Sequence, residues 1–159
     1  MKLTMEAWRR FLRLHGDERR IVLPAVAGLA ATWLGLRLTG FRRWQRTLGW
    51  LAPGKAANPV AAPAGLMERA REIARLEAAA ARNIPWRTNC LEQSLVLWWL
   101  LRQRGIQSDL RFGARKDAGR FEAHAWVELE GVNLSGLDAG HVDFVPFEGP
   151  IASLETQTH

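Results

Sequence analysis

The chain contains a single cysteine, Cys90, among its 159 residues. One cysteine cannot form an internal disulfide, and alone it does not supply the ligand set of a structural zinc site. The N-terminus lacks the pattern of a cleavable signal sequence, so nothing requires an oxidising compartment and we expect the protein in the cytoplasm. With 48% hydrophobic and 24% charged residues, the composition is typical of one folded domain, with or without an appendage.

Acidic residues are scarce in the first third of the chain. Residues 1–50 contain ten Lys and Arg against three Asp and Glu, a net charge of +7, whereas residues 51–159 contain twelve and thirteen, a net charge of −1. Such a basic region suits a membrane surface, an acidic peptide or nucleic acid, and it equally suits a solvated surface. No nucleic-acid-binding motif is present, so no nucleic-acid partner is expected, and contact with a membrane is left open.

Charged residues are also missing from residues 21–36, which include Pro24. This run is short for a membrane span and is flanked by arginines, so we interpret it as a buried or interfacial helix. Composition divides the chain into a basic helical region over residues 1–51, a Pro-, Ala- and Gly-rich linker or loop over residues 52–65, and a domain over residues 66–159.

The hydrophobic periodicity predicts helices followed by an antiparallel sheet, which is an α+β layout. Helices are expected over residues 5–14, 41–51 and 66–83, and strands over residues 109–114 and 121–130, with a polar turn at residues 115–119. A two-residue turn at Glu130 and Gly131 then leads into a further strand. In the strand 121–130, Phe121, Ala123, Ala125, Val127 and Leu129 are expected to face the core, and the residues between them to face away.

Cys90 is expected at the capped start of a buried helix. Asn89 is a suitable N-cap and Glu92 completes a capping-box pattern, so Cys90 becomes the first helical residue ahead of an apolar run that ends at Leu101. The positive end of the helix dipole favours a thiolate, and its N–H groups can bind an oxyanion. On this pattern alone, Cys90 is either a nucleophile or a small buried hydrophobe.

His124 is the candidate base that a thiol nucleophile requires. It follows Cys90 by 34 residues and lies on the polar face of its expected strand. Trp126 shares that face and either walls the site from water or packs against a neighbouring helix. Gln93 and Ser94, one turn into the helix, either border the oxyanion pocket or pack and cap the helix, and we expect the second role.

The segments NCLEQSLVLWWLLRQRGIQSDLRFGARK and FEAHAWVELEG resemble, in order and separation, the transglutaminase-like cysteine protease of lasso-peptide biosynthesis, the protease part of the B-type maturation protein. The resemblance covers residues 66–147, and the first third matches only in its apolar and basic character. It implies a papain/transglutaminase-like core in which a buried helix bearing Cys90 packs on an antiparallel sheet. It further implies a leader peptidase with a Cys-His-Asp triad, in which Cys90 is the nucleophile and His124 the base.

The resemblance leaves open which residue completes the triad. The family places an aspartate shortly after the next turn, where this chain reads VNLSGLDAGHVDF, so Asp138 is the first candidate and Asp143 lies further on. With a two-residue turn, Asn133 and Ser135 share the face of His124, and Asp138 joins them only through a bulge or a longer turn. Asn133 is the alternative, because an amide can also orient an imidazole.

The resemblance also implies partners. These are a precursor peptide with its leader, a separate leader-recognition protein and an ATP-dependent macrolactam cyclase, since this chain has no ATP-binding motif of its own. No metal or other cofactor is expected. Two alternatives remain, namely an acyltransferase of the same fold that passes the acyl group to an amine, and a non-catalytic peptide-binding module.

Overall fold

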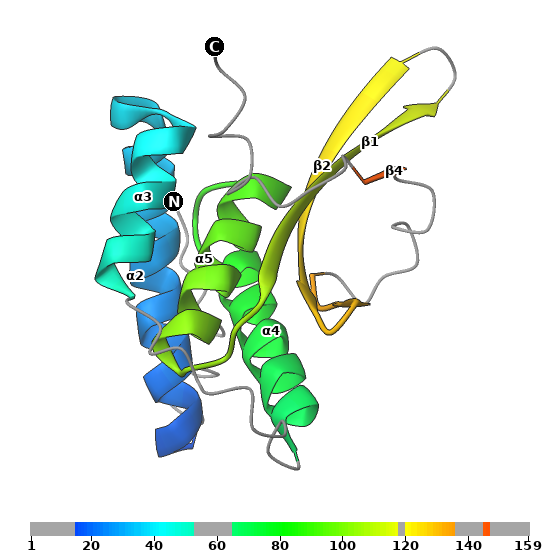
Figure 1. Cartoon of the computed structure of the whole chain (residues 1–159). Helices are drawn as coiled ribbons and strands as arrows, with labels where there is room; N and C mark the ends of the chain where they lie inside the picture. The colour runs from blue at the N-terminus through cyan, green and yellow to red at the C-terminus, as the bar shows by residue number, and fades with distance from the viewer. Residues whose placement is uncertain (1–14, 53–64, 118–119, 136–144, 147–159) are drawn as a thin grey trace.

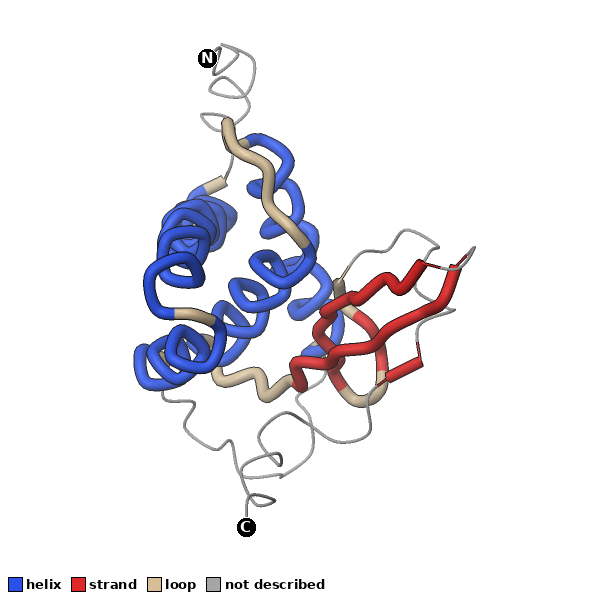
Figure 2. Tube along the Cα trace, turned by 90° about the horizontal axis from the view of Figure 1, so that it is seen from above, coloured by secondary structure: helices blue, strands red, loops and turns tan. Residues whose placement is uncertain are grey.

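A computed structural model of the chain describes residues 15–52, 65–117, 120–135 and 145–146. The helices form one side of the molecule and an antiparallel sheet forms the other (Figures 1 and 2). The described helices are α2 (Gly16–Thr39), α3 (Phe41–Leu51), α4 (Leu66–Asn83) and α5 (Cys90–Gln103), and the strands are β1 (Asp109–Asp117), β2 (Arg120–Leu129), β3 (Val132–Asn133) and β4 (Val145–Pro146). The α+β layout expected from the sequence is confirmed.

Helix α5 is the centre of the fold, because it contacts α2, α4 and the sheet. Its apolar run is largely buried, as expected, with Leu95, Val96, Leu97, Leu100 and Leu101 all at most 2% exposed and the two tryptophans between them partly buried. The helix ends in a Schellman motif. Gly105 adopts a φ of 74°, its N–H donates to the carbonyl of Arg102, and the N–H of Ile106 donates to that of Leu101 at 3.0 Å.

Helix α4 presents its predicted apolar stripe to the core. Ala70, Ile73, Leu76 and Ala80 are buried, and Glu77 is buried on the same face. Burial raises the pKa of the Glu77 carboxyl from 4.5 to about 8, against the lowering effect of Arg82. The stripe therefore contains a carboxyl group that is protonated at neutral pH, which the apolar periodicity did not single out.

Helix α2 packs on its neighbours through its middle section, burying Val22, Ala25, Gly28, Leu29, Thr32 and Gly35. Gly35 leaves room for the ring of Trp44, which a Cβ at this position would overlap, and Trp44 Nε1 donates to Thr32 Oγ1 at 3.1 Å. By length and composition α2 is sufficient to cross a membrane, and 33% of its most apolar window is buried. A core helix of a globular protein passes the same test, so this is weak evidence for a membrane span.

The sheet has the strand order β3-β2-β1-β4, and each neighbouring pair is antiparallel. The expected turn at Glu130 and Gly131 is confirmed, with φ angles of 53° and 78°, and it joins β2 to β3 through two residues. The turn expected at residues 115–119 is shorter, because β1 continues to Asp117 and β2 begins at Arg120. Backbone pairing with the opposite strand keeps these polar residues extended, whatever their intrinsic strand propensity.

The face of β2 that packs on α5 begins at Ala125. Ala125, Val127 and Leu129 are buried as expected, whereas Ala123 is exposed. The prediction of core-facing residues is therefore correct from Ala125 to Leu129 and wrong at Ala123, whose side chain is exposed. The helix expected at residues 5–14 and most of the linker lie outside the described residues, so the proposed division into regions stays a prediction.

Candidate active site

The start of α5 holds Cys90 through a complete capping box. The N–H of Glu92 donates to Asn89 Oδ1 at 2.9 Å, and the N–H of Asn89 donates to Glu92 Oε2 at 3.1 Å. Cys90 is the first residue of the helix, as predicted, and its thiol is free and partly exposed. The cap fixes the backbone that carries the thiol.

One turn further along, Ser94 ties α5 to strand β2. Its hydroxyl donates to the carbonyl oxygen of Ala125 at 2.9 Å, and Ser94 is 2% exposed. Residues four apart lie on the same side of a helix, so Cys90 follows Ser94 on that side, one turn toward the helix start. Ala125 is the neighbour of His124 in β2. This bond therefore holds the cysteine-bearing end of the helix beside the histidine-bearing part of the strand.

The Ala125 carbonyl is available to Ser94 because β3 leaves the sheet before reaching it. The Val127 carbonyl accepts from the Leu134 N–H at 2.8 Å, so the polar groups of Val127 point toward β3. The Val127 N–H donates at 2.8 Å to the Ser135 hydroxyl, where a continuing ladder would offer a backbone carbonyl. Backbone direction alternates along a strand, so Ala125 points to the same edge as Val127, beyond the last ladder bond.

His124 lies on the face of β2 opposite to that of Ala125, as expected from the alternation. The ring of Trp126 stacks on it with 6.1 Å between ring centroids and 15° between ring planes. Trp126 Nε1 donates to Glu128 Oε1 at 2.7 Å, and Glu128 Oε2 accepts from Arg111 Nε at 3.1 Å. Trp126 is 5% exposed. The indole is thus held in place next to the imidazole, and its role as a wall of the site stays a prediction.

The candidates for the third catalytic residue are not brought together with His124 in the described part of the chain. Asn133 pairs with Glu128, four residues along β2 from His124, which corresponds to about 13 Å. Its Oδ1 atom accepts from the N–H of Ser135 at 2.8 Å. Asp138 and Asp143 lie outside the described residues. The identity of this residue stays a prediction.

Other polar residues of the site region have structural partners. Gln93 Nε2 donates to Thr88 Oγ1 at 2.8 Å, which ties the helix to the segment before its cap. Packing and capping are the roles expected for Gln93 and Ser94. The bond between Trp126 and Glu128 was not predicted from the sequence, although a spacing of two residues in a strand puts both side chains on one face.

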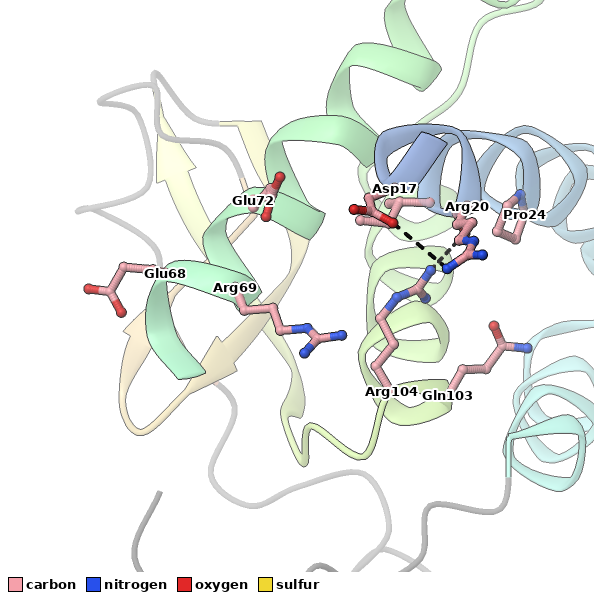
Figure 3. A pocket seen from close by; sticks show the side chains of 9 residues that line it. Asp17, Arg20, Pro24, Glu68, Arg69, Glu72, Gln103 and Arg104 are labelled. Carbon is pink, nitrogen blue, oxygen red and sulfur yellow. Dashed lines mark hydrogen bonds and ion pairs between the residues drawn. The ribbon is translucent and has the colours of Figure 1, made fainter. Parts of the chain in front are cut away.

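An open cavity of about 850 Å³ lies at the other end of α5, away from Cys90 (Figure 3). Arg104 donates there to the carbonyls of Leu100 at 3.0 Å and Arg20 at 2.9 Å. The cavity is lined by three arginines and three carboxylates together with three other residues: Asp17, Arg20, Ile21, Pro24, Glu68, Arg69, Glu72, Gln103 and Arg104. The opposite charges match in number, so the lining of this cavity carries no net formal charge.

Comparison with known proteins identifies the class. A family model described as the transglutaminase-like superfamily matches residues 35–148, from within α2 to just past β4. The chain belongs to the transglutaminase-like superfamily, and this membership suggests an activity of the cysteine protease or acyltransferase type. No curated protein and no solved structure gives a significant match.

Proposed function

We propose that the protein is a cysteine peptidase that removes the leader from a ribosomally made lasso precursor peptide. The observation that carries the proposal is the Ser94–Ala125 bond, because it ties the helix that begins at Cys90 to the backbone of β2 at the residue after His124. Membership of the transglutaminase-like superfamily supports the chemistry. The two sequence blocks around Cys90 and His124 support the substrate class.

In the proposed reaction, His124 takes the proton of the Cys90 thiol and the thiolate attacks the scissile carbonyl carbon. The cap already uses the N–H of Glu92, so the first-turn N–H groups of Cys90 and Leu91 are the donors proposed for the oxyanion. The core peptide leaves as an amine that takes its proton from His124. Water then hydrolyses the thioester and releases the leader as a carboxylic acid.

The remaining assignments complete the proposal. Asp138 fixes the His124 tautomer and stabilises the imidazolium, and Asn133 is the alternative for that role. Trp126 excludes water from the imidazole by covering one of its faces. A separate recognition protein delivers the leader, and an ATP-dependent cyclase uses the amine that cleavage sets free.

The direct test is a cleavage assay that contains the precursor, the recognition protein and this chain, with leader release followed by mass spectrometry. Cys90→Ala is expected to abolish release, and His124→Ala to reduce it by about 10³-fold or more. His15→Ala is the matched control, because His15 is exposed at the start of α2 and should retain full activity. Full leader release by Cys90→Ala would refute the proposal.

The same assay separates hydrolysis from acyl transfer. In the presence of an added primary amine, a peptidase still yields a leader with a free carboxylate, whereas an acyltransferase yields a leader amide. The third residue is assigned by comparing Asp138→Asn, Asp143→Asn and Asn133→Ala. The supporting residue is the one whose change lowers the cleavage rate and shifts its dependence on pH.

A further inference from the structure

The outer side of helix α2 carries an uncharged stripe that nothing covers in the described part of the chain. Leu23, Leu34 and Leu38 are 56%, 49% and 73% exposed. Ala27, Ala30 and Ala31 are exposed between them. At 3.6 residues per turn, the six side chains fall within an arc of about 100°, opposite the residues that pack on α4 and α5. The stripe is therefore a separate face of α2 and not the margin of its packed face.

Exposed arginine side chains lie on both sides of the turn between α2 and α3, near one end of this stripe. Arg37, Arg42, Arg43 and Arg46 are all exposed, and Trp50 is 79% exposed on the same side of α3 as Arg43 and Arg46. The chain contains no Asp or Glu between Glu18 and Glu68. From Arg19 to the end of α3, the hairpin thus combines apolar, aromatic and basic side chains without an acidic residue, and its two carboxylates, Asp17 and Glu18, lie in the first turn of α2 at the opposite end from the turn.

We propose that this surface, the outer face of the α2–α3 hairpin, binds the surface of an anionic lipid bilayer. The stripe of α2 enters the boundary between headgroups and acyl chains, the arginines bind anionic headgroups, and Trp50 lies at the interface. A second copy of the chain fits less well. Two-fold packing through the turn between α2 and α3 would bring two groups of arginines together, whereas the acidic side chains of the hairpin, Asp17 and Glu18, lie at the other end of α2.

The helix lies along the bilayer and does not cross it. It packs on α4 and α5 from Val22 to Gly35, its Thr32 bonds Trp44, and the Arg20 carbonyl accepts from Arg104. A crossing helix would lose these contacts. The sheet lies on the other side of the molecule from the hairpin, so the candidate active site stays open to its substrate (Figure 1).

The test is co-flotation of the full chain with vesicles of phosphatidylcholine, alone or mixed with phosphatidylglycerol. Binding is expected only with the mixed vesicles, and added salt should weaken it. Arg42→Gln/Arg43→Gln should lower the affinity about 30-fold, from about 1 kcal/mol for each arginine. The matched control is Arg71→Gln/Arg82→Gln, which removes the same charge from exposed positions on α4 and should change the affinity less than two-fold.

The apolar contribution is tested with Leu38→Gln/Trp50→Gln, which should lower the affinity at least ten-fold. Both residues are largely exposed, so folding and peptidase activity are expected to persist in this variant. Equal binding to both vesicle types, or equal loss in the α4 control, would overturn the proposal. It would also be overturned if no vesicles bind and the chain instead forms a dimer that Leu38→Gln/Trp50→Gln dissociates. Vesicle binding requires no catalysis, so its outcome is independent of the proposed peptidase function.

Discussion

The buried carboxyl of Glu77 makes the stability of this fold depend on pH. Glu77 is 3% exposed, and its Oε1 atom has no hydrogen-bond partner among the described residues. Burial raises its pKa from 4.5 to about 8, because desolvation disfavours the charged form. Between these two values the folded chain keeps a proton that the unfolded chain releases. Rising pH therefore favours unfolding across this interval.

The size of the effect follows from the pKa difference. One pKa unit corresponds to about 1.4 kcal/mol, so the full difference corresponds to about 5 kcal/mol. This stability is present below pH 4.5 and is lost as the pH rises to about 8. From pH 5 to pH 7.5, Glu77 alone should lower the free energy of unfolding by about 3 kcal/mol.

Glu77→Gln isolates this contribution, because glutamine keeps the shape of the side chain and does not titrate. Urea unfolding at a series of pH values should show the free energy of unfolding falling with pH more steeply in the wild type than in the variant. Glu72→Gln is the control, since Glu72 is exposed on the same helix and its variant should follow the wild type. Parallel curves for the wild type and Glu77→Gln between pH 5 and pH 8 would show that the buried carboxyl is not kept neutral.

Three further substitutions test the packing that positions the site. Ser94→Ala removes the bond to Ala125 and should lower the free energy of unfolding by about 1–2 kcal/mol in urea titrations; an unchanged value would mean that water replaces the hydroxyl. Asn89→Ala removes the cap of α5 and should cost about 1 kcal/mol in the same assay, with reduced helix content by circular dichroism. Gly35→Ala places a Cβ against an indole ring and should cost about 2 kcal/mol, whereas Gly49→Ala, whose nearest contact is 3.7 Å, should leave the melting temperature equal or higher.

The features that the sequence predicted well are those that depend on neighbouring residues. The cap formed by Asn89 and Glu92 and the turn at Glu130 and Gly131 are specified within a few positions of the chain. The burial of the α5 run up to Leu101 follows from its lack of polar residues. In each case a short pattern has one favoured structure, so the pattern is sufficient.

The features that the sequence left open depend on contacts between distant segments. The partner of Ser94 is 31 residues away and became available only because β3 leaves the sheet early. The shorter turn before β2 depends on backbone pairing, which side-chain polarity does not reveal. The position of Glu77 on the apolar stripe of α4 could be predicted, because it lies four residues from both Ile73 and Ala81. Its burial could not, because periodicity alone does not say that a carboxyl group is buried.

The position of the thiol depends on two kinds of interaction, which restrict different movements of α5. Apolar packing of Leu97 and its neighbours holds the helix in the core, but this force has no direction and sets the axial position of the helix only loosely. The hydrogen bonds of Asn89 and Ser94 have direction, and they act at the end of the helix where Cys90 lies. The cap fixes the local backbone, and the Ser94 bond fixes that backbone relative to β2. Because β2 also carries His124, these two polar anchors set the backbone at Cys90 relative to the backbone next to His124, a placement that non-directional apolar packing specifies less closely.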